Sequence, residues 1–289
     1  MGPTECSVQK GKGSSRWEYQ RANIARRHGF TLVELLVVIV IIGILAAIIT
    51  PVAFNALGNA RNAAISLELS KLSAALEAYK NEYGSYPPDM TNELQTRRHL
   101  SRLFPRQDLH EKNDLVALKL DPAEALVFWL RGFYPDPEHP LFGDSNHDEQ
   151  PDMERGTAFY EFPLAQLTDI DGDNLPEYSP PYCKRTPVVY FVHGPDHYHV
   201  GTNLKKYVLE QDINEAKPYI RNVDDPRHRY GPHNSFQLIC AGQDGRFGSW
   251  RDIPNKIYPT GQGYDPKGAD DDNITNFSNG KTLESAKLD

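Results

Sequence analysis

The sequence predicts an α+β fold in which a long N-terminal helix packs on a small antiparallel sheet that carries long loop insertions. Three observations predict this arrangement. Residues 35–49 contain no polar or charged side chain. Apolar side chains then recur every three or four residues as far as Tyr83, which is the period of a helix with one buried face. Short segments rich in Val, Ile, Tyr and Phe follow, and Pro and Gly separate them.

The first half of the predicted helix has the properties of a transmembrane span. Residues 30–53 carry a single charge, that of Glu34, and about 20 apolar residues are enough to cross a bilayer. Residues 1–29 hold more Lys and Arg than Glu, which predicts a cytoplasmic leader and a C-terminal body outside. A charge near the bilayer centre costs about 2.5–3.5 kcal/mol. We therefore expect Glu34 to be paired or functional.

The second half of the helix, residues 54–84, is predicted to be amphipathic, because Glu and Lys side chains lie between its apolar positions. Gly84 suits the end of a helix, and the prolines that follow cannot continue one. Pro51 removes one backbone hydrogen bond, so we expect a kink there. The apolar stripe consists of Ile65, Leu69, Leu72, Leu76, Tyr79 and Tyr83.

Residues 85–289 are predicted to form an extracytoplasmic globular domain with acidic loops. Two helices are expected, one over Asn92–Leu103 and one from an N-cap at Asp121 to about Gly132. Residues 134–157 combine Pro with many acidic residues and are expected to form a loop. The predicted strands are Ala158–Phe162, Pro187–His193 and Ser235–Ala241.

The segment Arg26-Arg27-His28-Gly29-Phe30-Thr31-Leu32-Val33-Glu34 resembles the N-terminal signature of type IV prepilins and pseudopilins. The resemblance implies a pilin-like fold and removal of residues 1–29 by a peptidase that cuts between Gly29 and Phe30. It also implies N-methylation of Phe30, a role for Glu34 in assembly and a helix kink at Pro51. An ordinary cleaved signal and a plain membrane anchor are the alternatives, but neither explains the position of Glu34.

A run of alternating acids in the body suggests a calcium site, because calcium takes about six to eight oxygen ligands from carboxylates and carbonyls. The run is similar to the loops of thrombospondin-type calcium repeats, and Leu175 can add a carbonyl. A solvated acidic turn is the alternative reading. Residues 144–152 have a related spacing, with Glu149 where Gly is usual. The candidate ligands of the first run are Asp169, Asp171, Asp173 and Glu177.

A third acidic segment lies near the C-terminus. Gly242-Gln243-Asp244-Gly245 ends a predicted strand, and Asp270-Asp271-Asp272-Asn273 follows later. This pattern is similar to the end of the major pseudopilins of type II secretion. The similarity implies a calcium loop with Asp244, Asp271 and Asp272 as candidate ligands. Residues 249–269 are an insertion that departs from the family pattern.

Two cysteines, Cys183 and Cys240, remain once the leader is removed. In an oxidising compartment they form either a disulfide or two buried thiols. His193, His197 and His199 form a cluster that would suit zinc in a membrane-tethered metal-dependent enzyme. No third ligand has the expected spacing, so we expect surface or hydrogen-bonded histidines, and zinc is the alternative.

Together these features predict a structural subunit of a type II secretion pseudopilus, with no enzymatic activity of its own and with bound calcium. The expected location is the bacterial inner membrane, crossed once. The expected partners are a prepilin peptidase, sister subunits and the secretion assembly platform in that membrane. The net charge of −8 argues against nucleic acid as a partner. A type IV pilus pilin for adhesion, motility or DNA uptake is the main alternative.

Overall fold

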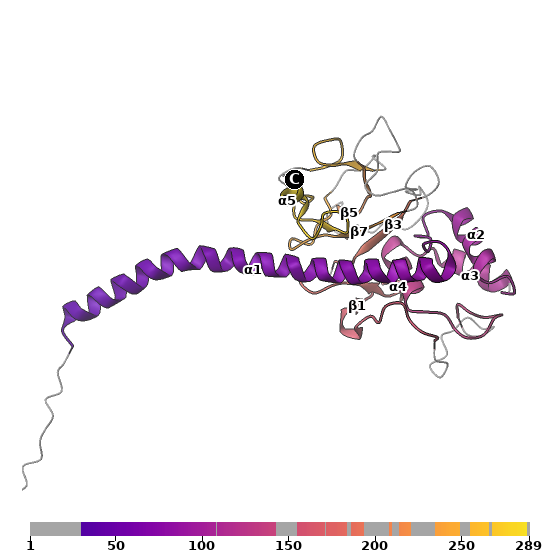
Figure 1. Ribbon diagram of the computed structural model, residues 1–289, viewed down its shortest axis with the longest axis horizontal. Helices are drawn as coiled ribbons and strands as arrows, with labels where there is room; N and C mark the ends of the chain where they lie inside the picture. The colour runs from indigo at the N-terminus through magenta and orange to yellow at the C-terminus, as the bar shows by residue number, and fades with distance from the viewer. Residues whose placement is uncertain are drawn as a thin grey trace, which may run out of the picture. The chain divides into compact units, whose positions relative to one another are not determined.

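Figure 1 shows the computed structural model, which describes residues 30–107, 109–142, 155–170, 172–183, 186–193, 208–209, 214–220, 235–248, 255–265 and 268–287. The first helix, α1, runs from Leu32 to Tyr83 and confirms the predicted long helix. The chain divides into two compact units at the boundary between Val52 and Ala53, which falls inside α1.

In the first unit, α1 is apolar on all sides and every residue from Phe30 to Val52 is exposed. Exposed apolar surface is unfavourable in water, so this part of the helix requires lipid or other helices around it. The Thr50 hydroxyl donates to the Ala46 carbonyl at 2.6 Å. The backbone stays helical at Pro51, and the kink expected there remains a prediction.

In the second unit, the remainder of α1 buries the predicted apolar stripe. The helix ends where the sequence indicates: Gly84 has a φ of +78° and donates its N–H to the Lys80 carbonyl at 2.7 Å. A left-handed conformation of this kind favours Gly at a helix C-terminus. Tyr83 is half-buried, and the buried residues are Ile65, Leu69, Leu72, Ala75, Leu76 and Tyr79.

The central sheet has three antiparallel strands in the order β3–β7–β9. Strands β3 (Val189–Val192) and β7 (Phe236–Cys240) confirm two of the three predicted strands. They pair with Val189 opposite Ile239 and Val192 opposite Phe236. Strand β9 (Ile274–Thr275) was not expected, because only two of its residues are extended.

The sheet separates two cores, because successive side chains of a strand point to opposite faces. Tyr190 and Leu238 lie in the core that includes the stripe of α1 and the helix α4 (Pro122–Leu130). Val189 and Ile239 lie in the other core, which is formed largely by the C-terminal part of the chain. The acidic C-terminal segment therefore belongs to the second core.

Two helices form as predicted. Helix α2 (Glu93–Leu103) begins after Asn92, whose side chain accepts the Gln95 N–H at 3.2 Å. Helix α4 begins with a capping box in which Asp121 and Glu124 each accept the other's backbone N–H, and all its residues are buried. Helix α3 (Leu109–Leu118) was not predicted, because its apolar residues form no clear stripe.

The predicted strand Ala158–Phe162 is wrong. The N–H groups of Phe159 and Tyr160 both donate to the Leu130 carbonyl, at 2.9 and 3.1 Å, so this backbone closes the C-terminus of α4 instead of joining a sheet. Its aromatic residues pack on the first core, and Phe159 lies 5.1 Å from the Tyr79 ring between centroids. Aromatic content thus reflected burial, not strand geometry.

The other described elements are short. The short strands form three two-stranded ladders, of which β1–β2 and β4–β5 are antiparallel and β6–β8 is parallel. They are η1 (Leu164–Gln166), β1 (Leu167–Thr168), β2 (Glu177–Tyr178), β4 (Val208–Leu209), β5 (Asn214–Glu215), β6 (Tyr219–Ile220), β8 (Lys256–Ile257) and α5 (Leu283–Ala286).

Candidate functional site

The start of α1 contains a capping box formed by Thr31 and Glu34. The Thr31 N–H and hydroxyl both donate to Glu34 Oε2, at 2.8 and 2.9 Å, and the Glu34 N–H donates back to Thr31 Oγ1 at 3.2 Å. This reciprocal pattern satisfies two donors that the first turn of a helix leaves open. The T-x-x-E spacing in the sequence is a signal for it that the sequence analysis missed. Gly29 lies outside the described residues, and Phe30 is 83% exposed.

The described part of the chain contains one helix that is long and apolar enough to cross a membrane, Leu32–Tyr83, judged by length and composition. Glu34 is the acidic residue of its first turn. The helix therefore presents a carboxylate close to the end of an otherwise apolar exposed surface. A partner for that carboxylate is favoured wherever water is excluded.

The acidic run between β1 and β2 uses its carboxylates to hold its own backbone. Asp169 accepts the N–H groups of Gly172, Asp173 and Asn174 at 2.8–3.1 Å. Glu177 is fully buried and its Oε2 accepts the Ile170 N–H at 3.0 Å. Two of the predicted ligands thus act as acceptors for turn amides, and Asp173 does the same for Leu175 N–H at 2.9 Å. Asp171 lies outside the described residues.

The C-terminal acidic turn brings Asp244 and Asp272 together, as the sequence predicts. Asp272 Oδ2 accepts the Asp244 N–H at 2.9 Å, whereas Asp272 Oδ1 is buried and accepts no hydrogen bond from the described residues. Burial raises the pKa of Asp272 to about 7, and the neighbouring Asp244 carboxylate adds to the rise. Gly242, with a φ of +65°, lies so close that a Cβ atom there would be 2.3 Å from the Asp272 carbonyl oxygen.

The pair Asp244 and Asp272 differs from the Asp169 turn in its electrostatics. The two carboxylates repel each other when both are charged, and one buried oxygen of Asp272 has no hydrogen-bond donor among the described residues. A divalent cation would reduce the repulsion and would give that oxygen a partner. The absence of a Cβ atom at Gly242 permits the close approach of the Asp272 backbone at the same place. Within the described residues, however, no group of three His, Cys, Asp or Glu side chains is arranged to hold a metal. Backbone carbonyls would have to supply much of the coordination.

Asp271, the third predicted ligand of this turn, has different partners. Its Oδ1 accepts the Tyr264 hydroxyl at 2.6 Å and also an N–H of the Lys287 ammonium group. That carboxylate is already matched by a cation. Its role in the structure is to anchor the C-terminal helix α5 to the turn.

Next to it, Asp270 forms a buried network that the sequence analysis missed. Its Oδ1 accepts from Lys256 Nζ and from the Tyr219 hydroxyl, both at 2.6 Å, and its Oδ2 accepts the Asp265 N–H at 2.9 Å. Both members of the ion pair are buried, and Lys256 also donates to the Phe247 carbonyl. Burial lowers the pKa of Lys256, and the Asp270 carboxylate opposes that effect. Sequence spacing gives no signal for this pair.

Gln243 connects the acidic turn to α1 within the second unit. Its side-chain amide donates to the Gly58 carbonyl at 3.0 Å and to Asn62 Oδ1 at 2.7 Å. The turn is therefore fixed on one side to the helix and on the other to the buried network around Asp270. A disulfide between Cys183 and Cys240 adds a covalent tie across a sequence separation of 57 residues.

Several predicted site residues lie outside the described residues. These are the second acidic run, residues 144–152, and His197 and His199 of the histidine cluster. His193 is among the described residues. It is buried, and its backbone N–H donates to the Ser235 carbonyl at 2.9 Å. The described residues accordingly give no support to a zinc enzyme.

Comparison with known proteins agrees with the geometry of the N-terminal segment. The prokaryotic N-terminal methylation motif matches residues 24–50. The chain is 42% identical over 65 residues to type II secretion system core protein G of Klebsiella pneumoniae, which covers 22% of this chain and 44% of that protein. It is 37% identical over 62 residues to the same core protein of Pseudomonas aeruginosa, with 22% and 44% coverage. It is 44% identical over 66 residues to the core protein G of Aeromonas hydrophila, and the match covers 22% of this chain and 43% of that protein.

The chain therefore spans less than half the length of these curated relatives. No solved structure shows significant similarity. The likeness is confined to the N-terminal region, whereas the α+β, pilin-like arrangement of helix and sheet comes from the fold itself. The chain thus carries the N-methylation motif of type IV pilins and pseudopilins and is distantly similar, over its N-terminal region, to type II secretion core protein G.

Proposed function

We propose that this chain is a structural subunit of a type II secretion pseudopilus. In this proposal a prepilin peptidase removes residues 1–29, and the subunit assembles through the first half of α1 on the secretion platform of the inner membrane. The observation that carries the proposal is the methylation motif at residues 24–50, followed directly by an apolar helix whose first turn contains Glu34. The secretion-system relatives favour a pseudopilus over other filaments.

Glu34 would change partners during assembly. Before assembly its Oε2 accepts two hydrogen bonds from Thr31. Cleavage after Gly29 creates a cationic amine at Phe30. Because an unmatched carboxylate among apolar helices is costly, the amine of a neighbouring subunit would stabilise the filament, and only at the axial stagger where the two charges meet. We propose that this match sets the position of each subunit.

The assignment of the cleavage site is tested by Gly29→Glu in the native host. We expect the variant to remain uncut, at the mass of the full chain, whereas the wild-type protein begins at Phe30. Gly43→Ala is a matched control, because a Cβ atom at Gly43 meets nothing within 4 Å and the residue lies far from the cut. Mass spectrometry of the N-terminus gives the readout. A correctly processed Gly29→Glu protein would refute the site.

The role of Glu34 is tested by two substitutions. Glu34→Gln keeps an oxygen that can accept the Thr31 hydrogen bonds but removes the charge, whereas Glu34→Ala removes both. We expect normal processing of both variants and about a tenfold or greater loss of assembled filament in both. If Glu34→Gln assembled normally and only Glu34→Ala failed, the carboxylate would serve helix capping alone.

A type IV pilus pilin is the second candidate, because the methylation motif is common to both classes. Deletion of the gene separates the two. Loss of protein secretion with intact surface motility and DNA uptake supports the pseudopilus, and the reverse supports the pilus.

Calcium is part of the proposal at one place, the pair Asp244 and Asp272. When bound, the ion would supply charge neutralisation for two carboxylates and would stabilise only the folded chain. The buried Asp272 oxygen and the close approach of Gly242 support it.

A further inference from the structure

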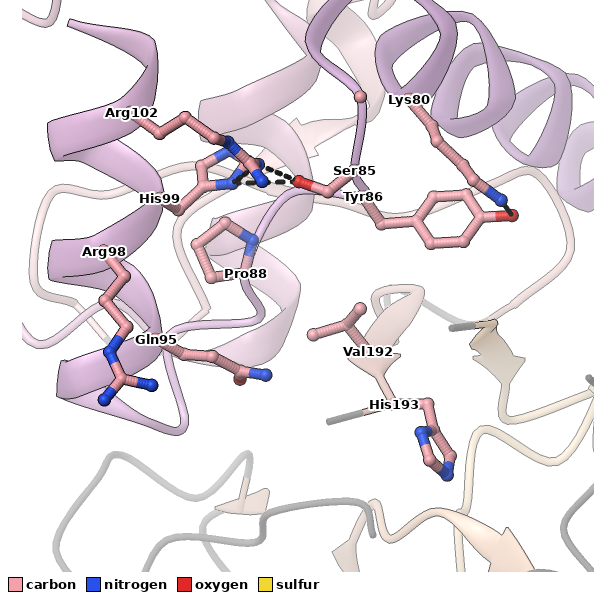
Figure 2. Close-up of a pocket in the computed structure, with 11 residues that line it drawn as sticks. Lys80, Ser85, Tyr86, Pro88, Gln95, Arg98, His99, Arg102, Val192 and His193 are labelled. Carbon is pink, nitrogen blue, oxygen red and sulfur yellow. Dashed lines mark hydrogen bonds between the residues drawn. The ribbon is translucent and has the colours of Figure 1, made fainter. Parts of the chain in front are cut away.

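The second unit contains a cavity of about 410 Å³ between the end of α1, helix α2 and strand β3. Figure 2 shows the side chains that line it. Cavities of this volume typically hold small organic ligands. The apolar part of the wall comes from Tyr86, Pro88 and Val192, and the polar part includes Ser85, Gln95 and His193. No part of the proposed assembly mechanism uses this cavity.

The lining is cationic in an otherwise acidic chain. Three of its residues, Lys80, Arg98 and Arg102, are cations, and among the described residues that line it there is no Asp or Glu. The whole chain has a net charge of −8. A concentration of positive charge against this background requires a local reason, and an anionic ligand is one.

Arg102 is held in place at the rim of the cavity. Its guanidinium donates to His99 Nδ1 at 3.1 Å and to the Ser85 hydroxyl, and both interactions are drawn in Figure 2. Because a guanidinium can only donate, His99 Nδ1 accepts, and Nε2 carries the proton toward Tyr79 Oη at 2.9 Å. Burial lowers the pKa of His99 to about 3, and Arg102 adds to that effect, so the ring is neutral at pH 7. Neither partner neutralises Arg102.

Arg98 lies one helical turn before Arg102 on the same face of α2, since the two are four residues apart. Within the described residues no hydrogen bond or ion pair engages its guanidinium, and its side chain is exposed. Figure 2 shows the two guanidinium groups pointing in different directions, that of Arg102 toward Ser85 and that of Arg98 away from it. The guanidinium of Arg98 therefore offers its own fork of donors, which matches the oxygens of a phosphate group.

Two acids whose partners line the cavity or its wall are already hydrogen-bonded. Glu77 accepts the Tyr86 hydroxyl at 2.6 Å. Asp89 is buried behind the wall, where it accepts the Val192 N–H at 2.9 Å and the Thr91 hydroxyl at 2.6 Å. Neither carboxylate lines the cavity, so the charge of the wall remains positive.

We propose that this cavity binds a phosphorylated sugar, with Arg98 holding the phosphate, with Arg102 and Lys80 adding positive charge to the wall, and with Ser85, Gln95 and His193 facing the sugar hydroxyls. A dianion suits three cations better than a single carboxylate does. The volume exceeds what inorganic phosphate fills, and the polar groups beyond the arginines suit hydroxyls. The sugar phosphate is either a free metabolite or the terminal residue of a phosphorylated glycan. This inference depends on neither processing nor assembly.

The test is titration of the full-length protein in detergent with glucose 6-phosphate, glucose and inorganic phosphate, followed by isothermal calorimetry. We expect saturable binding of glucose 6-phosphate, about tenfold tighter than binding of either glucose or phosphate. Arg98→Ala should weaken it about tenfold without altering the melting temperature, because that side chain is exposed and has no hydrogen bond or ion pair with the described residues.

Arg97→Ala is the matched control. Arg97 is the preceding residue of α2 and carries the same charge, but it bonds Glu93 and Asn113, each at 2.7 Å, away from the cavity. Its loss should change the affinity by less than about twofold. Equal losses in both variants, equal affinities for phosphate and glucose 6-phosphate, or no saturable binding would each overturn the proposal.

A second experiment, with a phosphomannan oligosaccharide and its dephosphorylated form, identifies the source of the sugar phosphate. Tighter binding of the phosphorylated oligosaccharide than of the free sugar phosphate supports a glycan, and the opposite order supports a metabolite.

Discussion

The two described acidic turns have similar compositions and opposite environments. In the turn that follows β1, Asp169 faces backbone amides of its own loop and is largely surrounded by water. In the C-terminal turn, Asp270 is buried against a lysine and Asp272 lies beside another carboxylate. A carboxylate that already accepts hydrogen bonds from the amides of its own turn needs no further ligand. A carboxylate that is buried or close to another carboxylate is stabilised by a cation. The difference shows that environment, more than the spacing of acids, decides which turn depends on positive charge.

The largest expected effect comes from replacing Lys256, the cation that is buried against Asp270. Lys256→Met leaves Asp270 buried without its partner, so the free energy of unfolding should fall by about 3–5 kcal/mol. Chemical denaturation of the full-length protein in detergent measures it. Lys287→Met is the matched control, because Lys287 and Asp271 are more accessible than the first pair and should lose less. A double variant, Lys256→Met with Asp270→Asn, should recover part of the loss; no recovery would mean that packing, not charge, holds this core.

The next effect concerns an added cation. Calcium at about 100 times its dissociation constant should raise the free energy of unfolding by about 2.7 kcal/mol. Asp272→Asn should abolish this increase, whereas Asp169→Asn should leave it unchanged. Thermal melts in chelator and in millimolar calcium give the readout. An unchanged wild-type melt would remove the calcium proposal, and a calcium effect lost only in Asp169→Asn would move the site to the other turn.

The smallest effect is a pH dependence in chelator. Because folding raises the pKa of Asp272 to about 7, the stability that this group contributes is fully present below its unfolded value of 3.8 and is lost as the pH rises through about 7. The melting temperature of the wild-type protein should therefore fall more steeply than that of Asp272→Asn between pH 5 and pH 8. Other titrating groups are common to both proteins and cancel in the difference. Parallel curves would contradict the close pairing of Asp244 and Asp272.

Much of the fold could be predicted from the sequence. The period of the apolar residues identifies α1 and its buried stripe, and capping residues identify α2 and α4, because both signals are local. Strands β3 and β7 are rich enough in β-branched and aromatic residues to stand out. Strand β9 could not be predicted, since its extension depends on pairing with β7 across many intervening residues.

The candidate site divides in the same way. The N-terminal motif is contiguous, so Phe30 and Glu34 could be located from the sequence. The C-terminal pair Asp244 and Asp272 was reached through family resemblance, and the structure brings them together. The Lys256–Asp270 pair and the cationic cavity escaped prediction, because both bring together residues from separate elements that no spacing rule connects.

One contact has a mechanical consequence. The Gln243 side chain donates hydrogen bonds to α1 at Gly58 and Asn62, a few residues beyond the proline in the helix. Unwinding that starts near the proline would reach these two hydrogen bonds before it reached the buried stripe at Ile65. Those two hydrogen bonds would have to break along the way, so we expect Gln243 to oppose the spread of unwinding toward the buried stripe.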